Sequence, residues 1–104
     1  MPTMIDFQGL SIRLTEERLA HILEHPEMAG MRSAIEKTLS KPQKVVQSQS
    51  DPSARLYYRY YLATIVGNKY LCVVVKISGN DAFVITAYLT DQIKRGVLIW
   101  PQET

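Results

Sequence analysis

Three long runs of apolar, aromatic and β-branched residues, separated by short turn sequences, determine what kind of fold this chain can adopt. The runs cover residues 55–66, 70–77 and 82–89, and the turns Gly67-Asn68 and Ser78-Gly79-Asn80-Asp81 lie between them. Runs of this length are typical of strands, and turns this short connect antiparallel neighbours. The sequence therefore predicts an antiparallel meander. Weaker strand patterns precede it over residues 7–14 and 44–50, and a short one follows over residues 97–100.

Helical signals lie in the part of the chain that precedes the meander. Thr15 is a favourable N-cap, and an apolar stripe follows it until Pro26 ends the segment. A second segment, over residues 28–39, has apolar residues at helical spacing and ends before Pro42. We therefore expect one α+β domain over residues 1–104, with two N-terminal helices packed on one face of a roughly four-stranded antiparallel sheet.

Size, charge and cysteine usage restrict the class of protein. With 104 residues and a formal net charge of +2, the chain is modestly basic and of single-domain size. Its one cysteine, Cys72, excludes an internal disulfide and agrees with a reducing compartment. No apolar segment has membrane-spanning length, and residues 1–6 lack the pattern of a signal peptide. We therefore expect a cytoplasmic protein with no membrane partner.

Residues 55–61 give the predicted meander one face of unusual composition. Because side chains alternate along a strand, the run divides into an apolar set and a set of arginines and tyrosines. The second set consists of Arg55, Tyr57, Arg59 and Tyr61. If the helices cover the apolar set, the neighbouring strands add three more donors to the uncovered face. These donors are Lys76, Thr86 and Tyr88.

This predicted open face carries cations, phenols and a hydroxyl, and none of the residues in the pattern is a carboxylate. Guanidinium groups bind phosphate and aromatic rings stack on bases, so the pattern is typical of a surface for a phosphate-bearing ligand. The same residues also fit an ordinary solvated sheet face, where Tyr and Thr favour the strand and Lys and Arg favour solubility. The pattern alone leaves both interpretations open.

The two histidines, His21 and His25, are four residues apart and share one side of the first predicted helix. They could ligate zinc, although no third ligand lies near them in the sequence. One of them could act as a general base, because histidine titrates near neutral pH. His25 could also hydrogen-bond the last carbonyls of its helix.

Several short motifs follow one another along the chain. They are His21-x3-His25-Pro26-Glu27-Met28, Ile35 with Leu39 and Pro42, Tyr57-Tyr58-Arg59, Val73-Val74-Val75-Lys76, Thr86-Ala87-Tyr88 and Ile99-Trp100. Taken in this order, they resemble a known family, the small phage-associated nuclease-like domains grouped with barnase, EndoU, colicin-type tRNases and RelE toxins. The similarity covers roughly residues 18–100, and it depends on the order of the motifs rather than on any one of them.

This resemblance implies a metal-independent endoribonuclease that needs no cofactor, attacks the scissile phosphate with the RNA 2′-hydroxyl and leaves a 2′,3′-cyclic phosphate. It implies an RNA site on the open face of the sheet. The roles implied are acid–base catalysis for His21 or His25, charge stabilisation for Arg59 and Lys76, and proton or hydrogen-bond donation for Thr86 and Tyr88. Tyr57 or Tyr61 would stack on a base, beside Arg55.

Two other functions are compatible with the same residues. The predicted open face could bind RNA or a protein without catalysis, or its aromatic residues could form a dimer interface. RNA is the expected partner, and a toxin-like nuclease could also have a neutralising protein partner.

Overall fold

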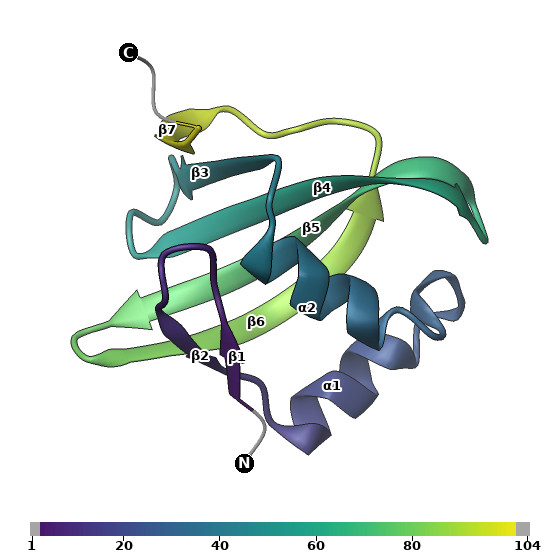
Figure 1. Ribbon diagram of the computed structural model, residues 1–104, viewed down its shortest axis with the longest axis horizontal. Coiled ribbons are helices and arrows are strands. Elements are labelled where there is room, and N and C mark those ends of the chain that lie inside the picture. Colours follow the sequence, from purple (N-terminus) through teal and green to yellow (C-terminus); the bar gives the residue numbers. More distant parts are fainter. Residues whose placement is uncertain (1–2, 102–104) are drawn as a thin grey trace.

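The computed structural model describes residues 3–101 and shows one seven-stranded sheet with two α-helices on one side (Figure 1). The strands are β1 (Thr3–Ile5), β2 (Ser11–Arg13), β3 (Lys44–Ser48), β4 (Ala54–Thr64), β5 (Gly67–Ser78), β6 (Asp81–Thr90) and β7 (Gly96–Trp100). The helices are α1 (Glu16–Leu23), the short 3-10 helix η1 (Pro26–Met28) and α2 (Arg32–Ser40).

The order of strands across the sheet is β1-β2-β6-β5-β4-β3-β7. Neighbours are antiparallel except β2 and β6, which run parallel where Arg13 lies opposite Phe83. The predicted fold of two helices on a roughly four-stranded antiparallel sheet is therefore wrong. The short strands β1, β2 and β7 widen the meander into a mixed sheet that curls into a half-barrel. The sequence indicates short strands over residues 7–14, 44–50 and 97–100, but strands of three to five residues carry too little alternation to specify which strands they pair with.

The three central strands are those that the sequence predicts, but the turn between β4 and β5 lies at residues 65–66 and not at Gly67-Asn68, which belongs to β5. Two irregularities also change which side chains share a face. The β4–β5 ladder shifts between Tyr61 and Thr64, where Ala63 adopts a φ of 55°. The β5–β6 ladder shifts next to Val75, so Phe83 lies opposite Lys76 instead of pointing toward the helices with Ala87. A bulge of this kind moves every later side chain to the other face, and simple alternation cannot locate it.

The first helix begins and ends as its sequence indicates, whereas the second predicted helix is interrupted. The Thr15 hydroxyl accepts a hydrogen bond from the Arg18 N–H, and α1 ends before Pro26. Residues 26–40 form η1 and α2, with Gly30 between them at a φ of 76°. Such a backbone conformation favours glycine and ends a helix. Neither α1 nor α2, within the part of the chain described, has the length and apolar character that a membrane span requires.

The sheet has a buried cluster on each side. The main core lies between the helices and the sheet and includes Leu19, Ile22, Ile35, Leu39, Tyr57, Leu71, Val73 and Val75. A smaller cluster on the other side consists of Val46, Leu56, Tyr58 and Cys72, with Ile93 packed against it. Ile93 belongs to residues 91–95, which connect β6 to β7 and which we call the crossover. The helices thus cover one face, and the crossover covers part of the other, which we call the open face.

Candidate functional site

The arginine–tyrosine set of β4 faces the helices, so the prediction that it forms the open face is wrong. Tyr57 is 0% exposed, and its hydroxyl donates a hydrogen bond to Asp6 Oδ2 at 2.7 Å. Burial, followed by this carboxylate, raises the pKa of Tyr57. The Tyr61 hydroxyl donates to the Ala34 carbonyl at 2.9 Å. Neither ring is free to stack on a base, because both are part of the contact between helix and sheet.

The arginines of this set also lie on the helix side. Arg59 Nη1 donates a hydrogen bond to the Lys41 carbonyl at 2.7 Å, where α2 has just ended. This contact satisfies a carbonyl at the helix C-terminus, and the positive charge there is favourable for the helix dipole. Arg55 Nη1 lies 3.5 Å from Gln8 Oε1. Arg59, predicted to stabilise charge on a phosphate, thus has a structural contact in this fold.

The other predicted donors do lie on the open face, but Lys76 has a carboxylate partner. Lys76 Nζ lies 2.7 Å from Asp51 Oδ2, and the Ser53 hydroxyl donates to Asp51 Oδ1 at 2.6 Å. These contacts, with that of Lys76 the largest, hold the pKa of Asp51 at about 2. Thr86 is exposed, and Tyr88 lies partly buried opposite Cys72. The expectation of a face free of carboxylates is therefore wrong around Lys76.

Both histidines are exposed on the outer surface of the helix side. His21 Nδ1 lies 3.5 Å from Glu24 Oε2, and the two imidazole centroids are 6.4 Å apart. Because α1 packs on the helix side of β6, the histidines lie on the opposite side of the sheet from Lys76. Residues 3–101 contain no cluster of three His, Cys, Asp or Glu side chains that could hold a metal ion. The sheet thus separates the predicted catalytic residues into two groups.

A different group of cations lies together on the open face, beside the crossover. A depression of about 350 Å³ lies between β3, the crossover and β7, and we call it the basic groove. Its lining consists of Lys44, Val46, Ile93, Lys94, Arg95, Gly96 and Leu98. Among these described residues are three cations and no carboxylate. The groove therefore combines an apolar floor with positive charge at its edges, a combination that suits an anion carrying a flat or apolar body.

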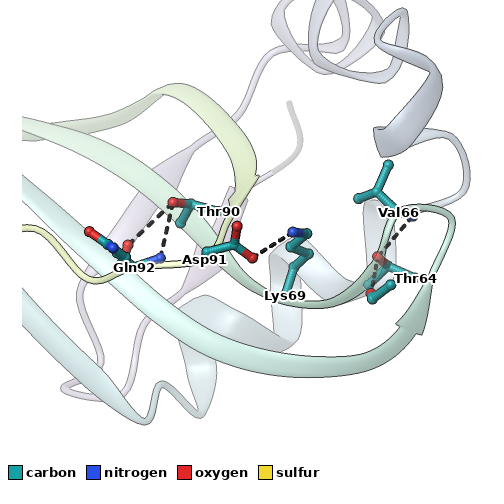
Figure 2. A network of polar contacts seen from close by, with 7 residues as sticks. Thr64, Val66, Lys69, Thr90, Asp91 and Gln92 are labelled. Carbon is teal, nitrogen blue, oxygen red and sulfur yellow. Dashed lines mark hydrogen bonds and ion pairs between the residues drawn. The ribbon is translucent and has the colours of Figure 1, made fainter.

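The crossover is attached at both ends of its path, which fixes the position of the groove. Figure 2 shows Asp91 paired with Lys69 of β5, next to a turn in which Thr90 and Gln92 exchange hydrogen bonds. Further on, the Lys94 N–H donates to the Tyr58 hydroxyl at 3.0 Å. The charged heads of Lys94 and Arg95 make no ion pair with the described residues, so they remain available to a ligand.

Below the crossover, Tyr58, Cys72 and Tyr88 form a polar layer within the smaller cluster. Burial raises the pKa of both phenols and of the thiol. The Lys94 ammonium lies 5.8 Å from the centroid of the Tyr88 ring. The phenols therefore stay protonated as hydrogen-bond donors, and the thiol stays protonated as a poor nucleophile. This layer supports the crossover from below, and it presents no ready general base.

The basic groove is not predicted by local sequence patterns, because its cations come from segments far apart in the chain. Residues 90–93 have the pattern of one helical turn, whereas residues 91 and 92 form bends that lead into the crossover. The signal that could have found the groove is Lys94-Arg95, two adjacent cations directly before the glycine that begins β7. Comparisons of the chain with protein-family models, curated proteins and solved structures find no match.

Proposed function

We propose that the open face binds single-stranded RNA and that the basic groove holds the phosphate backbone. The supporting observation is the juxtaposition of Lys44, Lys94 and Arg95 around an apolar floor, without a carboxylate among the described lining residues. Each cation that neutralises a phosphate releases counterions, and this release supplies most of the affinity of such a surface. Arg95 adds planar donors that match a phosphate.

Aromatic side chains on the same face support the choice of RNA as the ligand. Tyr60 and Tyr70 lie on neighbouring strands with ring centroids 4.9 Å apart, and Tyr60 is 41% exposed. Tyr70 also contacts the ring of Tyr58, whose hydroxyl holds the crossover. The aromatic row thus runs toward the groove, and bases can stack on its exposed end while phosphates occupy the groove.

Binding without cleavage fits this arrangement better than an endoribonuclease does. A metal-independent RNase needs an acid and a base within hydrogen-bond reach of the same phosphate. The histidines lie on the helix side, and Lys76 on the open face is paired with Asp51. Burial raises the pKa of the Tyr88 phenol, so the phenol stays protonated at neutral pH and does not act as a general base. The open face therefore offers contacts for RNA, and the groups expected to catalyse cleavage are not assembled on it.

The test is a fluorescence-anisotropy titration of a labelled oligouridine of about 12 nucleotides, a length matched to small single-strand sites. The Lys44→Gln, Lys94→Gln and Arg95→Gln triple variant should bind at least about tenfold more weakly. The slope of its log affinity against log salt concentration should become shallower by about 0.7 for each phosphate that is no longer neutralised. A matched triple variant on the helix side, Arg18→Gln with Lys37→Gln and Lys41→Gln, removes the same charge and should retain most of the affinity.

Two results would contradict the proposal in different ways. An equal loss of affinity in both triple variants would mean that binding reflects net charge rather than the groove. RNA cleavage by the wild-type protein in EDTA, yielding a 2′,3′-cyclic phosphate, would favour an endoribonuclease instead of a binding module.

A further inference from the structure

A second depression lies on the helix side of the sheet, at the end of β4 away from the β4–β5 turn. We call it the Arg55 notch. It has a volume of about 320 Å³, and its lining consists of Gln47, Pro52, Ser53, Arg55, Ile77 and Ile99. Gln47 and Arg55 lie directly opposite each other on β3 and β4. The notch thus combines three polar groups, a guanidinium, an amide and a hydroxyl, with the apolar side chains of two isoleucines and a proline.

The guanidinium in this notch has no charged partner among the described residues. Its neutral contacts are a long hydrogen bond to Gln8, at 3.5 Å, and an interaction with the Tyr57 hydroxyl. Arg55 as a whole is only partly exposed, so the fold removes part of its hydration. A cation that is partly desolvated and has no counterion favours the binding of an anion, because the anion supplies the missing charge-assisted hydrogen bonds.

The carboxylates in this part of the fold already have partners of their own. Asp51 accepts hydrogen bonds from Lys76 and Ser53. Asp6 accepts from the Tyr57 hydroxyl and from the backbone N–H groups of residues 8 and 10. Neither carboxylate comes within ion-pair distance of Arg55, so the notch keeps its positive charge.

We infer that the Arg55 notch binds a small monocarboxylate with a short apolar body. A guanidinium can hold a carboxylate through two parallel hydrogen bonds, and the Gln47 amide can donate a third. Ile77 and Ile99 provide an apolar wall for the body of the ligand. A single cation beside an apolar wall favours a monoanion over the doubly charged phosphate, which more cations would bind better. A free short-chain acid and the C-terminal carboxylate of a peptide both present this chemistry.

The test follows backbone amide shifts by two-dimensional NMR while butyrate, acetate, inorganic phosphate or a capped dipeptide ending in valine is added. Butyrate or the dipeptide should give saturable shifts centred on Ser53, Arg55 and Ile77. Acetate should bind several-fold more weakly, since it makes no contact with the wall. The dipeptide amide, which lacks the carboxylate, should give no saturable shift. A preference for butyrate indicates a free acid, and a preference for the dipeptide indicates a peptide terminus.

Two variants connect the binding to Arg55. Arg55→Gln should weaken it by more than about tenfold, because the bidentate pair is lost, whereas Arg18→Gln on α1 should leave it unchanged. Gln47→Glu places a carboxylate opposite Arg55 and should compete with the ligand to a similar extent. This second variant keeps the test decisive if Arg55→Gln fails to fold.

The inference is overturned if phosphate shifts the same amides with equal or greater affinity, if Gln47→Glu binds as the wild type does, or if no carboxylate gives saturable shifts. None of these results depends on RNA binding, because the notch and the basic groove lie on opposite sides of the sheet and share no lining residue.

Discussion

Tyr57 and Tyr58 are adjacent in β4, are both 0% exposed and point to opposite sides of the sheet. On the helix side, the Tyr57 hydroxyl donates to the buried Asp6 carboxylate, and its neighbours Arg59 and Tyr61 bond to backbone carbonyls of the α2 region. On the open face, the Tyr58 hydroxyl accepts a hydrogen bond from the crossover backbone. The polar groups of β4 on the helix side thus hold the helices to the sheet, whereas the Tyr58 hydroxyl on the open face holds the crossover that carries Lys94 and Arg95.

Removing the two hydroxyls one at a time tests this division of roles between the two faces of the sheet. Tyr57→Phe should destabilise the protein by about 3 kcal/mol, because a buried carboxylate loses a partner. Tyr58→Phe should cost only about 1 kcal/mol, because a neutral hydrogen bond is lost. Urea denaturation measures both changes. Of the two variants, Tyr58→Phe should weaken RNA binding, since Lys94 loses its backbone anchor. Equal destabilisation, or weaker RNA binding in Tyr57→Phe alone, would contradict the division of roles between the two faces.

The end of the crossover, where Gly96 begins β7, is the next feature of the open face to test. A Cβ on Gly96 would collide with the Gln47 carbonyl oxygen and with Val46 Cγ1. Because a backbone carbonyl cannot move aside as a side chain can, Gly96→Ala should cost about 2 kcal/mol. Val97→Ala is the control, since Val97 is 63% exposed and its truncation should cost less than about 0.5 kcal/mol. Thermal unfolding of the two variants gives the comparison, and similar melting temperatures would show that β3 and β7 adapt to the extra methyl group.

The sequence predicted the elements that carry their own signals, and it indicated most of the short strands, but it did not give the partners with which the short strands pair. The central strands have long β-branched and aromatic runs, and α1 has its cap at Thr15, so local rules located them, although they placed the β4–β5 turn two residues late. Strands β1 and β2 are three residues each, and β2 meets β6 through one residue pair. The final strand pairs with β3, roughly 50 positions earlier, which the local pattern could not indicate.

The candidate site was harder to predict than the fold, because both faces of β4 carry tyrosines. Alternation separates Tyr57 from Tyr58 but cannot tell which of them the helices cover. Asp6, which lies outside the predicted meander, accepts a hydrogen bond from the Tyr57 hydroxyl, and this contact shows that Tyr57 is the tyrosine on the helix side. The basic groove joins Lys44 to Lys94 and Arg95 through the β3–β7 pairing, so its prediction requires a strand partner that the sequence does not specify.

The smallest of the expected effects concerns Lys76, a cation of the open face that has a carboxylate partner. Lys76 and the Ser53 hydroxyl hold the pKa of Asp51 at about 2, below its ordinary value of 3.8. Folding therefore favours the ionised carboxylate. The stabilisation from this pair is complete above about pH 4, and it is lost as the pH falls through about 2.

Asp51→Asn should accordingly be less stable than the wild type at neutral pH, and the difference should narrow as the pH decreases from about 4 to about 2. Urea midpoints at several pH values measure this convergence. Glu36→Gln is the matched control, because Glu36 is an exposed carboxylate in the middle of α2 with no ion pair to the described residues, and its curve should run parallel to that of the wild type. A constant gap between Asp51→Asn and the wild type down to about pH 2 would show that Lys76 is effectively unpaired. In that case Lys76 would join Lys44, Lys94 and Arg95 as a free cation of the open face.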